Sequence, residues 1–252
     1  MSQSSDRLMS IVESFLVHPR QTLSEAASAC ELEPATAIRY LRQLVARGWL
    51  ERDEAGKTYS LGVALVTLGA AAQAARPLRT RAMPYMRQLL AQFEETVNIA
   101  TEHRGDIIII EALEGGRSIR RGAMLGEKDD WFGSSLGKCI LAWMPEAKVS
   151  ALFDLHPPER HTEKSLTSLE DVMADLARVR ERGYALDDEQ FEIGLKCVGV
   201  PVRTAAGGVP THAISISGPT QRIDGRLTEI VEALKGVSQA ISVAAKAGEN
   251  QS

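Results

Sequence analysis

An acidic cluster that leads into a buried strand is the part of the sequence best suited to chemistry. Asp187 to Glu189 follow Gly183, which ends a helical pattern, and Cys197 lies in the apolar run that comes next. Carboxylates seldom lie beside a strand that must be buried unless something pairs with them. The stretch therefore predicts one wall of a small polar pocket or a local hydrogen-bond network; an acidic surface loop entering a core strand is the alternative.

A predicted helix start supplies a second candidate. Ser134 can cap a helix that begins at Ser135 and passes through Cys139 to Trp143. The backbone N–H groups of Ser135 and Leu136 then lack acceptors within the helix and favour a carboxylate or another anion. Every helix has such an end, so this motif has little specificity by itself.

Catalysis by Cys197 as a nucleophile is an alternative function. It needs a base and oxyanion donors, and no histidine is tied to Cys197 by local sequence. The three cysteines form no CxxC pair and show no metal-ligand spacing with the histidines. We therefore predict no disulfide framework, no metal site and no cofactor. These residues are Cys30, Cys139 and Cys197, with His103, His156, His161 and His212.

Length and composition indicate an ordinary globular protein. The chain has 252 residues, of which 44% are hydrophobic and 25% charged, and a net charge of −4. This length suits one large domain or two modest ones. The N-terminus is polar, and no segment approaches the roughly 20 apolar residues that span a bilayer, so we expect a cytoplasmic protein without membrane contact. Nucleic-acid binding must rest on local charge, because the total is acidic.

The N-terminal region reads as three short helices. Apolar spacing predicts helices over residues 6–17, 25–30 and 34–47, with Ser24 as a cap of the second helix and Gly48 ending the third. Tight turns between such helices are typical of the helix-turn-helix motif.

The third helix carries a face that suits base reading. Ile38, Leu41 and Val45 are expected to point inward, which leaves polar side chains on the other side. Arginine binds guanine edges or phosphate, and glutamine binds adenine. A solvated helix face is the alternative. The candidates are Thr36, Arg39, Tyr40, Arg42 and Gln43.

A short hairpin follows that helix. Residues 49–52 and 58–61 are β-like runs around a polar turn. A hairpin after a recognition helix is a wing. Arg52 and Lys57 are then expected near DNA phosphates, where they add affinity without sequence information.

The remainder indicates a linker and an α+β domain. Residues 62–76 form an alanine-rich pattern, interpreted as a linker helix that pairs with its copy in a dimer; an ordinary packed helix is the alternative. Strands between first and last helices favour a sheet with helices mainly on one face. The expected helices are 81–95, 168–182 and 225–247, and the expected strands include 97–101, 107–113, 198–203 and 211–217.

Four motifs together resemble the IclR-type transcriptional regulators over essentially the whole chain. They are Leu136-Gly137-Lys138, residues 182–189, residues 194–201, and Ile214 to Pro219. The resemblance implies an α+β fold: an N-terminal winged helix-turn-helix (1–61), a linker helix (62–80) and a C-terminal GAF-like α/β effector domain with an antiparallel sheet (81–252). It also implies homodimers or dimers of dimers (homotetramers), and control of operons for the catabolism of small organic acids.

The resemblance also implies an effector pocket. Ala35 departs from the family, because a basic or polar residue is common there, and Arg121 stands where an apolar pocket residue is common. Because two adjacent arginines on a strand expose only one, we hypothesise that Arg121 turns inward to an anionic effector; two solvated arginines are the alternative. The implied pocket residues are Ser135, Leu136, Asp187, Leu195 and Cys197, with Ser215 and Ser217 on the neighbouring strand.

The resulting prediction is a regulator that binds double-stranded operator DNA, acts as a repressor of catabolic genes and responds to a small carboxylate. Trp131, Phe132 and Trp143 near the pocket region favour an aromatic carboxylate, although an aliphatic keto acid also fits. The alternatives are a cysteine-dependent enzyme, or a small-molecule sensor that uses the Asp187/Cys197 pocket without DNA.

Overall fold

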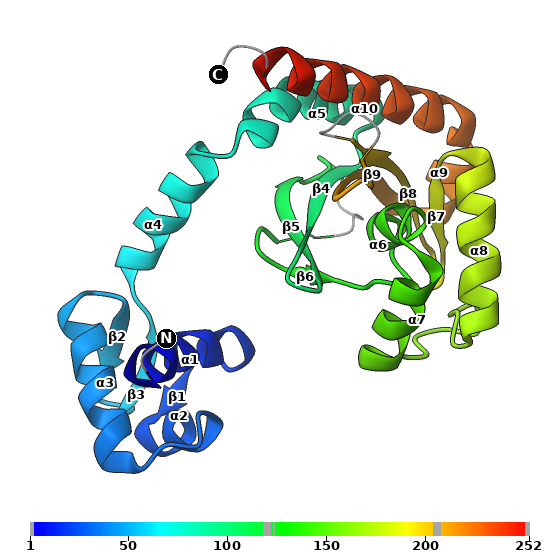
Figure 1. Ribbon diagram of the computed structural model, residues 1–252. Helices are drawn as coiled ribbons and strands as arrows, with labels where there is room; N and C mark the ends of the chain where they lie inside the picture. Colours follow the sequence, from blue (N-terminus) through cyan, green and yellow to red (C-terminus); the bar gives the residue numbers. More distant parts are fainter. Residues whose placement is uncertain (1–2, 118–121, 123, 204–207, 250–252) are drawn as a thin grey trace. The chain divides into compact units, whose positions relative to one another are not determined.

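The computed structural model describes residues 3–117, 122, 124–203 and 208–249, and the chain divides into two compact units (Figure 1). Unit 1 is Met1–Ala75 and unit 2 is Arg76–Ser252. In the residues described, no helix combines the length and the apolar character that crossing a membrane requires.

Unit 1 is a winged helix-turn-helix, as predicted. Three helices pack around a core that includes Ile11, Phe15, Leu41 and Leu44. An antiparallel sheet of order β1-β3-β2 contains the wing, in which Leu50 pairs with Leu61. The elements are α1 Gln3–Val17, β1 Gln21–Thr22, α2 Leu23–Ala29, α3 Pro34–Ala46, β2 Leu50–Asp53 and β3 Thr58–Leu61.

The start of α2 differs from the prediction. Thr22, and not Ser24, is the N-cap: its hydroxyl accepts from the backbone N–H of Glu25 at 3.3 Å, and the Glu25 carboxylate accepts from the backbone N–H of Thr22 at 2.7 Å. This reciprocal capping box satisfies two backbone donors at once, which a cap at Ser24 does not. The end of α3 is as predicted, with Gly48 at φ +69°.

Helix α4, Val63–Ala74, follows the wing, and α5, Pro77–Phe93, begins unit 2. Helix α5 starts at Pro77 rather than Arg81, because proline suits the first helical position. Every residue of α4 is described and none of them is buried, although the helix consists mostly of alanine, valine and leucine.

Unit 2 is built on one antiparallel sheet of order β6-β5-β4-β9-β8-β7. Strands β8 and β9, which cover most of the predicted strands 198–203 and 211–217, pair with each other in antiparallel fashion. Its strands are β4 Thr96–His103, β5 Asp106–Leu113, β6 Lys128–Asp129, β7 Ala185–Asp188, β8 Leu195–Val202 and β9 His212–Pro219.

Helices cover both faces of this sheet, so the expectation of helices mainly on one face is wrong. One core joins α5 and α10 to the sheet through residues such as Met86, Ile216 and Leu234. The other joins α6, α7 and α8 through residues such as Ile140 and Leu176. The central strands are buried on both faces, which requires two covering layers. The helices are α6 Ser135–Leu141, α7 Glu146–Leu155, α8 Leu169–Arg182, α9 Thr220–Asp224 and α10 Leu227–Glu249.

Helix α8 has the predicted ends. The Ser168 hydroxyl accepts from the N–H of Asp171 at 3.1 Å, and Gly183 takes φ +78° at the other end. Both signals are local in sequence, so the boundaries follow from the sequence alone. The last turn of α8 leads directly into the acidic stretch of β7.

Candidate functional site

The exposed face of α3 carries most of the predicted DNA-reading residues. Arg39, Arg42 and Gln43 are exposed, and Thr36 is half-buried in the first turn. No acidic side chain lies within α3, which spans Pro34–Ala46. The helix therefore presents local positive charge and amide groups to solvent in a protein of net negative charge.

Tyr40 does not belong to this face, which corrects the prediction. Its side chain is 3% exposed and packs in the core of unit 1, and its hydroxyl lies 3.0 Å from the Ser4 hydroxyl of α1. The inward stripe of α3 is Ala37, Tyr40, Leu41 and Leu44, a complete i, i+3, i+4, i+7 pattern. The predicted inward residues Ile38 and Val45 are only half-buried.

The Tyr40 ring still supports the reading face. The guanidinium carbon of Arg39 lies 5.0 Å from the centre of the ring, which is the geometry of a cation–π contact. The buried tyrosine therefore acts on Arg39 by limiting its orientation.

The wing places its two predicted cations differently. Arg52 lies over the Tyr59 ring at 5.9 Å and pairs with Glu54 at 3.3 Å, so part of its charge is neutralised. Lys57 sits at the exposed hairpin turn with φ +51°. Of the two, Lys57 is the cation without an ion pair among the described residues.

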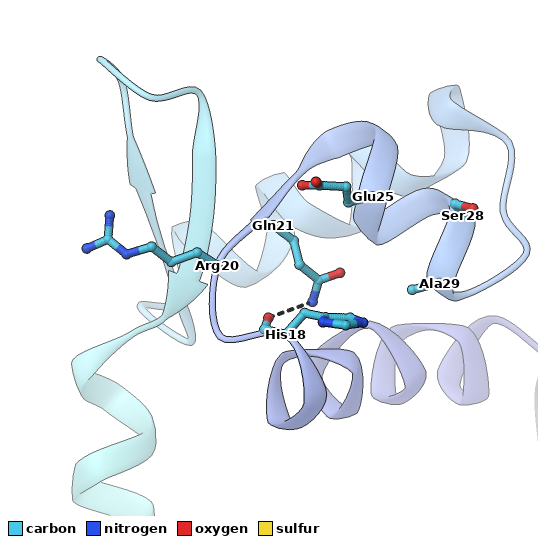
Figure 2. Close-up of a pocket in the computed structure, with 6 residues that line it drawn as sticks. All are labelled: His18, Arg20, Gln21, Glu25, Ser28 and Ala29. Carbon is cyan, nitrogen blue, oxygen red and sulfur yellow. Dashed lines mark hydrogen bonds between the residues drawn. The ribbon is translucent and has the colours of Figure 1, made fainter.

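A hollow between α1, β1 and α2 was not predicted (Figure 2). Gln21 forms its floor and is almost fully buried; its amide N–H₂ donates to the carbonyl of His18 at 3.1 Å. The Arg20 side chain points away from Gln21 and Glu25 (Figure 2). Arg20 is exposed and adds a positive charge to unit 1. It lies outside α3, so the helical periodicity of α3 could not identify it from the sequence.

The second site lies in unit 2, on the sheet face that α6 covers. Cys197 of β8 pairs with Ser217 of β9, and Ser215 of β9 pairs with Asn98 of β4. Side chains alternate along a strand, so these four polar groups share one face in an otherwise apolar interior.

Two glycines allow α6 to reach this polar face. A Cβ on Gly199 would lie 2.9 Å from the carbonyl oxygen of Ser135, and a Cβ on Gly137 would lie 2.4 Å from that of Asp130. Real Cβ atoms do not come so close to backbone. The first turn of α6 is therefore held between β8 and the segment before it.

The start of α6 offers backbone donors, as predicted. The Ser134 hydroxyl accepts from the N–H of Gly137 at 2.9 Å. As the first two helical residues, Ser135 and Leu136 have N–H groups with no acceptor inside the helix. Both residues line a small cavity between α6 and the polar strands.

A small cavity, with about 10 Å³ of space accessible to water, lies between this helix start and the polar strands. Asn98 Oδ1, Ser135 Oγ and Ser215 Oγ are buried, and none has a hydrogen-bond partner within the described chain. Such groups cost about 1–3 kcal/mol each when left unsatisfied. The lining residues among those described are Asn98, Ile109, Asp129, Ser134, Ser135, Leu136, Cys197, Ser215 and Ser217.

The structure thus brings five of the predicted effector residues together and adds four. Ser135, Leu136, Cys197, Ser215 and Ser217 line the cavity as predicted. Asn98, Ile109, Asp129 and Ser134 are new to the site. Of these four residues, Asn98 could have been identified from the sequence, because a polar residue inside the apolar strand Val97 to Ala100 is costly to bury without a partner.

Two predicted residues are placed elsewhere. Asp187 is fully buried, but its Oδ1 accepts from the backbone N–H groups of Gln190 at 2.8 Å and Phe191 at 3.2 Å. This is the local hydrogen-bond network that the sequence left as an alternative. Leu195 is buried at the start of β8 and, like Asp187, is not among the described residues that line the cavity. Arg121 lies outside the described residues.

The aromatic residues near the site do not line it either. Trp131 and Phe132 are buried in the core between the sheet and α6 to α8. Trp143 is half-buried beneath the Arg203 guanidinium, 4.2 Å from the ring centre. The described lining is therefore polar and aliphatic.

A buried ion pair fixes α6 to the acidic stretch. Lys138 is 1% exposed; its ammonium pairs with Asp175 of α8 at 3.1 Å and donates to the Leu186 carbonyl and the Gln190 side chain. Because Gln190 also contacts Asp187, this network joins α6, α8 and the loop after β7.

The cysteines show no arrangement for catalysis. Burial raises the pKa of the Cys139 thiol to about 12, so it stays protonated. Cys197 lines the cavity, but none of the described residues that line it with Cys197 is a histidine or lysine. Within the described chain, no group of three or more metal-binding side chains comes together.

Comparison with known proteins identifies both units. The family "IclR helix-turn-helix domain" matches residues 4–54, and "Bacterial transcriptional regulator IclR C-terminal" matches residues 70–243. The HTH-type transcriptional regulator BhcR of Paracoccus denitrificans is 30% identical over 97% of this chain and 89% of that protein. The HTH-type transcriptional repressor AllR of Escherichia coli is 28% identical over 88% of this chain and 82% of that protein.

A solved structure extends the comparison to the fold. An IclR homolog from Microbacterium hydrocarbonoxydans, complexed with 4-hydroxybenzoate, superposes with a TM-score of 0.82 at 25% identity. The match covers 97% of this chain and 100% of that one.

The contact between α6 and β8 predicts a specific sensitivity at Gly199. In Gly199→Ala, the added methyl would meet the Ser135 carbonyl, so the free energy of unfolding of unit 2 should fall by about 1–3 kcal/mol. Urea unfolding followed by circular dichroism measures this. Gly236→Ala in α10 is the control: nothing lies within 4 Å of its Cβ position, and alanine is the better helix former. Equal stability of the two variants would show that α6 does not depend on this close approach.

Proposed function

Because the chain belongs to the IclR family of bacterial transcriptional regulators, we propose that it represses a catabolic operon and that a small carboxylate bound at the start of α6 changes its affinity for DNA. The matched families and the named relatives are transcriptional regulators, so the chain is a DNA-binding regulator and not an enzyme. We also propose that the protein acts in the cytoplasm, where it binds its operator DNA.

The observation that carries the effector proposal is the cavity with unpartnered buried groups. The hydroxyls of Ser135 and Ser215 can each donate a hydrogen bond, and both residues line the cavity beside the backbone N–H groups of Ser135 and Leu136. A carboxylate larger than a water molecule would have to enlarge this cavity, which has about 10 Å³ of space accessible to water. A carboxylate accepts several such bonds at once. Its binding offsets the cost of leaving these groups dry.

The DNA interface that we propose is the exposed face of α3 with the wing. Arg39 and Gln43 are assigned to base edges, and Thr36, Arg42, Arg52 and Lys57 to phosphates. Tyr40 is assigned a supporting role beneath Arg39. Arg20 is added as a further phosphate contact, because it is exposed on unit 1 and its side chain points away from Gln21 and Glu25 (Figure 2).

Replacing Arg39 should weaken operator binding selectively. In Arg39→Ala, affinity for the DNA upstream of the gene should fall by about 1–3 kcal/mol, or roughly 5–150-fold, because a base contact is lost. Fluorescence anisotropy with unrelated competitor DNA measures this over a range of salt concentrations. Arg178→Ala on α8 is the control: that side chain is exposed but lies in unit 2. If both variants bound as wild type, α3 would not be the reading helix.

Regulation requires that the effector prefer one state of the protein. A ligand with equal affinity for the DNA-bound and free forms shifts nothing, however tightly it binds. For a repressor that its effector releases from DNA, the effector must bind the free form better than the DNA-bound form. The direction of regulation that we propose, repression, is supported by the similarity to AllR, whose name describes that protein as a repressor.

Carboxylates should release the operator through the cavity. Pyruvate, glyoxylate, benzoate and 4-hydroxybenzoate, added to the anisotropy assay, should include at least one acid that lowers DNA affinity. Ser215→Ala removes a cavity hydroxyl and should raise the acid concentration needed by roughly 10-fold, with DNA affinity unchanged. Ser150→Ala on α7 is the matched control, since its hydroxyl bonds only locally to the Glu146 carbonyl. An acid that released DNA equally from both variants would bind elsewhere.

We also propose that α4 pairs with its copy in a homodimer, from which a dimer of dimers can form. Val63, Val66 and Leu68 are 67%, 70% and 49% exposed. Exposed apolar surface of this kind marks interaction sites, and two copies of a helix-turn-helix protein read two half-sites.

A charge on α4 should break this dimer. Val66→Asp should shift the sedimentation coefficient in analytical ultracentrifugation to that of a monomer at concentrations where the wild type is dimeric, because a carboxylate would be buried unpaired. Glu146→Gln at the exposed start of α7 is the control. A dimeric Val66→Asp protein would place the interface elsewhere.

A further inference from the structure

An open hollow lies at the edge of the sheet in unit 2, where β8 extends beyond β7. Strand β7 begins at Ala185, which pairs with Gly199, whereas β8 continues to Val202. The chain leaves α8 through Gly183, which lines the hollow beside this end of β8. The hollow has about 260 Å³ of space accessible to water and shares no described lining residue with the cavity at the start of α6. Its polar lining side chains are Arg203, Lys235, Ser238, Gln239 and Ser242.

Two cations that line this hollow lie over aromatic rings. The guanidinium carbon of Arg203 lies 4.2 Å from the centre of the Trp143 ring. The ammonium nitrogen of Lys235 lies 5.7 Å from the centre of the Tyr184 ring. Arg182, which precedes Gly183, lies over the same tyrosine ring at 4.7 Å. A cation–π contact orients a positive charge without neutralising it, so these charges stay available to a ligand.

Within the described chain, acidic side chains do not balance these charges. No aspartate or glutamate is among the described residues that line the hollow. Neither Arg203 nor Lys235 forms an ion pair with any described residue, although Glu232 lies three residues before Lys235 on α10. Thr204 to Gly207, which follow Arg203 in the sequence, include no acid. The described lining therefore carries a net positive charge.

Hydrogen bonds leave few side-chain donors for a ligand other than those of the cations. The Ser238 hydroxyl donates to the Pro201 carbonyl at 2.6 Å, and the Ser242 hydroxyl donates to the Ser238 carbonyl at 2.7 Å. Arg203 donates one guanidinium N–H to the Gly208 carbonyl at 2.7 Å, which leaves its other N–H groups. An anion in the hollow would therefore be bound mainly by Arg203 and Lys235, from β8 and α10.

We infer that this hollow binds a phosphate monoester, that is, a small metabolite with a terminal phosphate group. Such a phosphate carries about 1.5–2 negative charges at pH 7 and has three strong acceptor oxygens. Arginine binds phosphate through two N–H groups at once, and lysine binds it as a point charge. A carboxylate has one charge and two oxygens, so it would balance less of the positive charge. This site goes beyond the proposed function, which concerns the α6 cavity and the DNA-reading face of unit 1.

Calorimetry with small probes tests the site. Inorganic phosphate, glycerol 3-phosphate, glycerate and glycerol would be titrated into the full-length protein at constant ionic strength. We expect both phosphate compounds to bind and glycerol not to bind. Lys235→Ala and Arg203→Ala should each weaken phosphate binding by roughly 10–100-fold, because each removes a hydrogen bond between charged groups.

Matched variants separate binding from stability. Lys148→Ala removes an exposed lysine of α7 and should bind both phosphate compounds as the wild type does. Lys235→Arg keeps the positive charge and should retain most of the affinity. Thermal unfolding without ligand checks that each variant is folded; if Arg203→Ala is not, Arg203→Gln takes its place.

Several outcomes would overturn the inference without touching the proposed function. One is that neither phosphate compound binds, and another is that Lys235→Ala and Arg203→Ala bind them as tightly as Lys148→Ala does. Glycerate binding that exceeds glycerol 3-phosphate binding and is lost in Lys235→Ala would make this a carboxylate site. Operator DNA in the anisotropy assay should bind Lys235→Ala and the wild type equally. If Lys235→Ala instead weakened DNA binding and the phosphate compounds did not bind, the hollow would contact the DNA backbone and not a metabolite.

Discussion

The close approach of α6 to β8 is the constraint on which unit 2 depends. Only a residue without a Cβ fits at Gly199, where the Ser135 carbonyl lies against the strand, and Gly137 meets the same condition against the preceding segment. These contacts place the donors of a helix start directly over a sheet. A larger residue at either position would clash with the backbone and move the helix.

The cavity is a polar exception inside an apolar interior. Two cores lie on the two faces of the sheet, one beneath α5 and α10 and the other beneath α6 to α8. They contribute the stability that allows Asn98, Ser135 and Ser215 to remain buried without partners. Such groups are costly to bury unless a partner satisfies them. A ligand that bound here, as we propose, would therefore stabilise unit 2.

Buried polar residues also shape unit 1, where they orient rather than bind. The Tyr40 ring packs in the core, and its hydroxyl forms a hydrogen bond with the Ser4 hydroxyl. The same ring lies under the Arg39 guanidinium. In unit 2, the Lys138 and Asp175 pair joins α6 to α8 without bordering the cavity within the described chain. In both units, residues that hold a candidate site residue in place lie beneath it in the protein interior. Sequence periodicity does not distinguish such residues from core residues.

Local signals in the sequence were enough to predict several helix boundaries and the family. Ser168 and Gly183 bound α8, Pro34 and Gly48 bound α3, and the motifs around Leu136 and Ile214 identified the family, because caps, turns and motifs act within a few residues. Tertiary structure decided which side chains share a space. Asn98 joined the site and Asp187 left it through strand pairing and a local network, and Tyr40 turned inward to reach Ser4. Such choices depend on partners distant in sequence, which periodicity along one helix or strand does not contain.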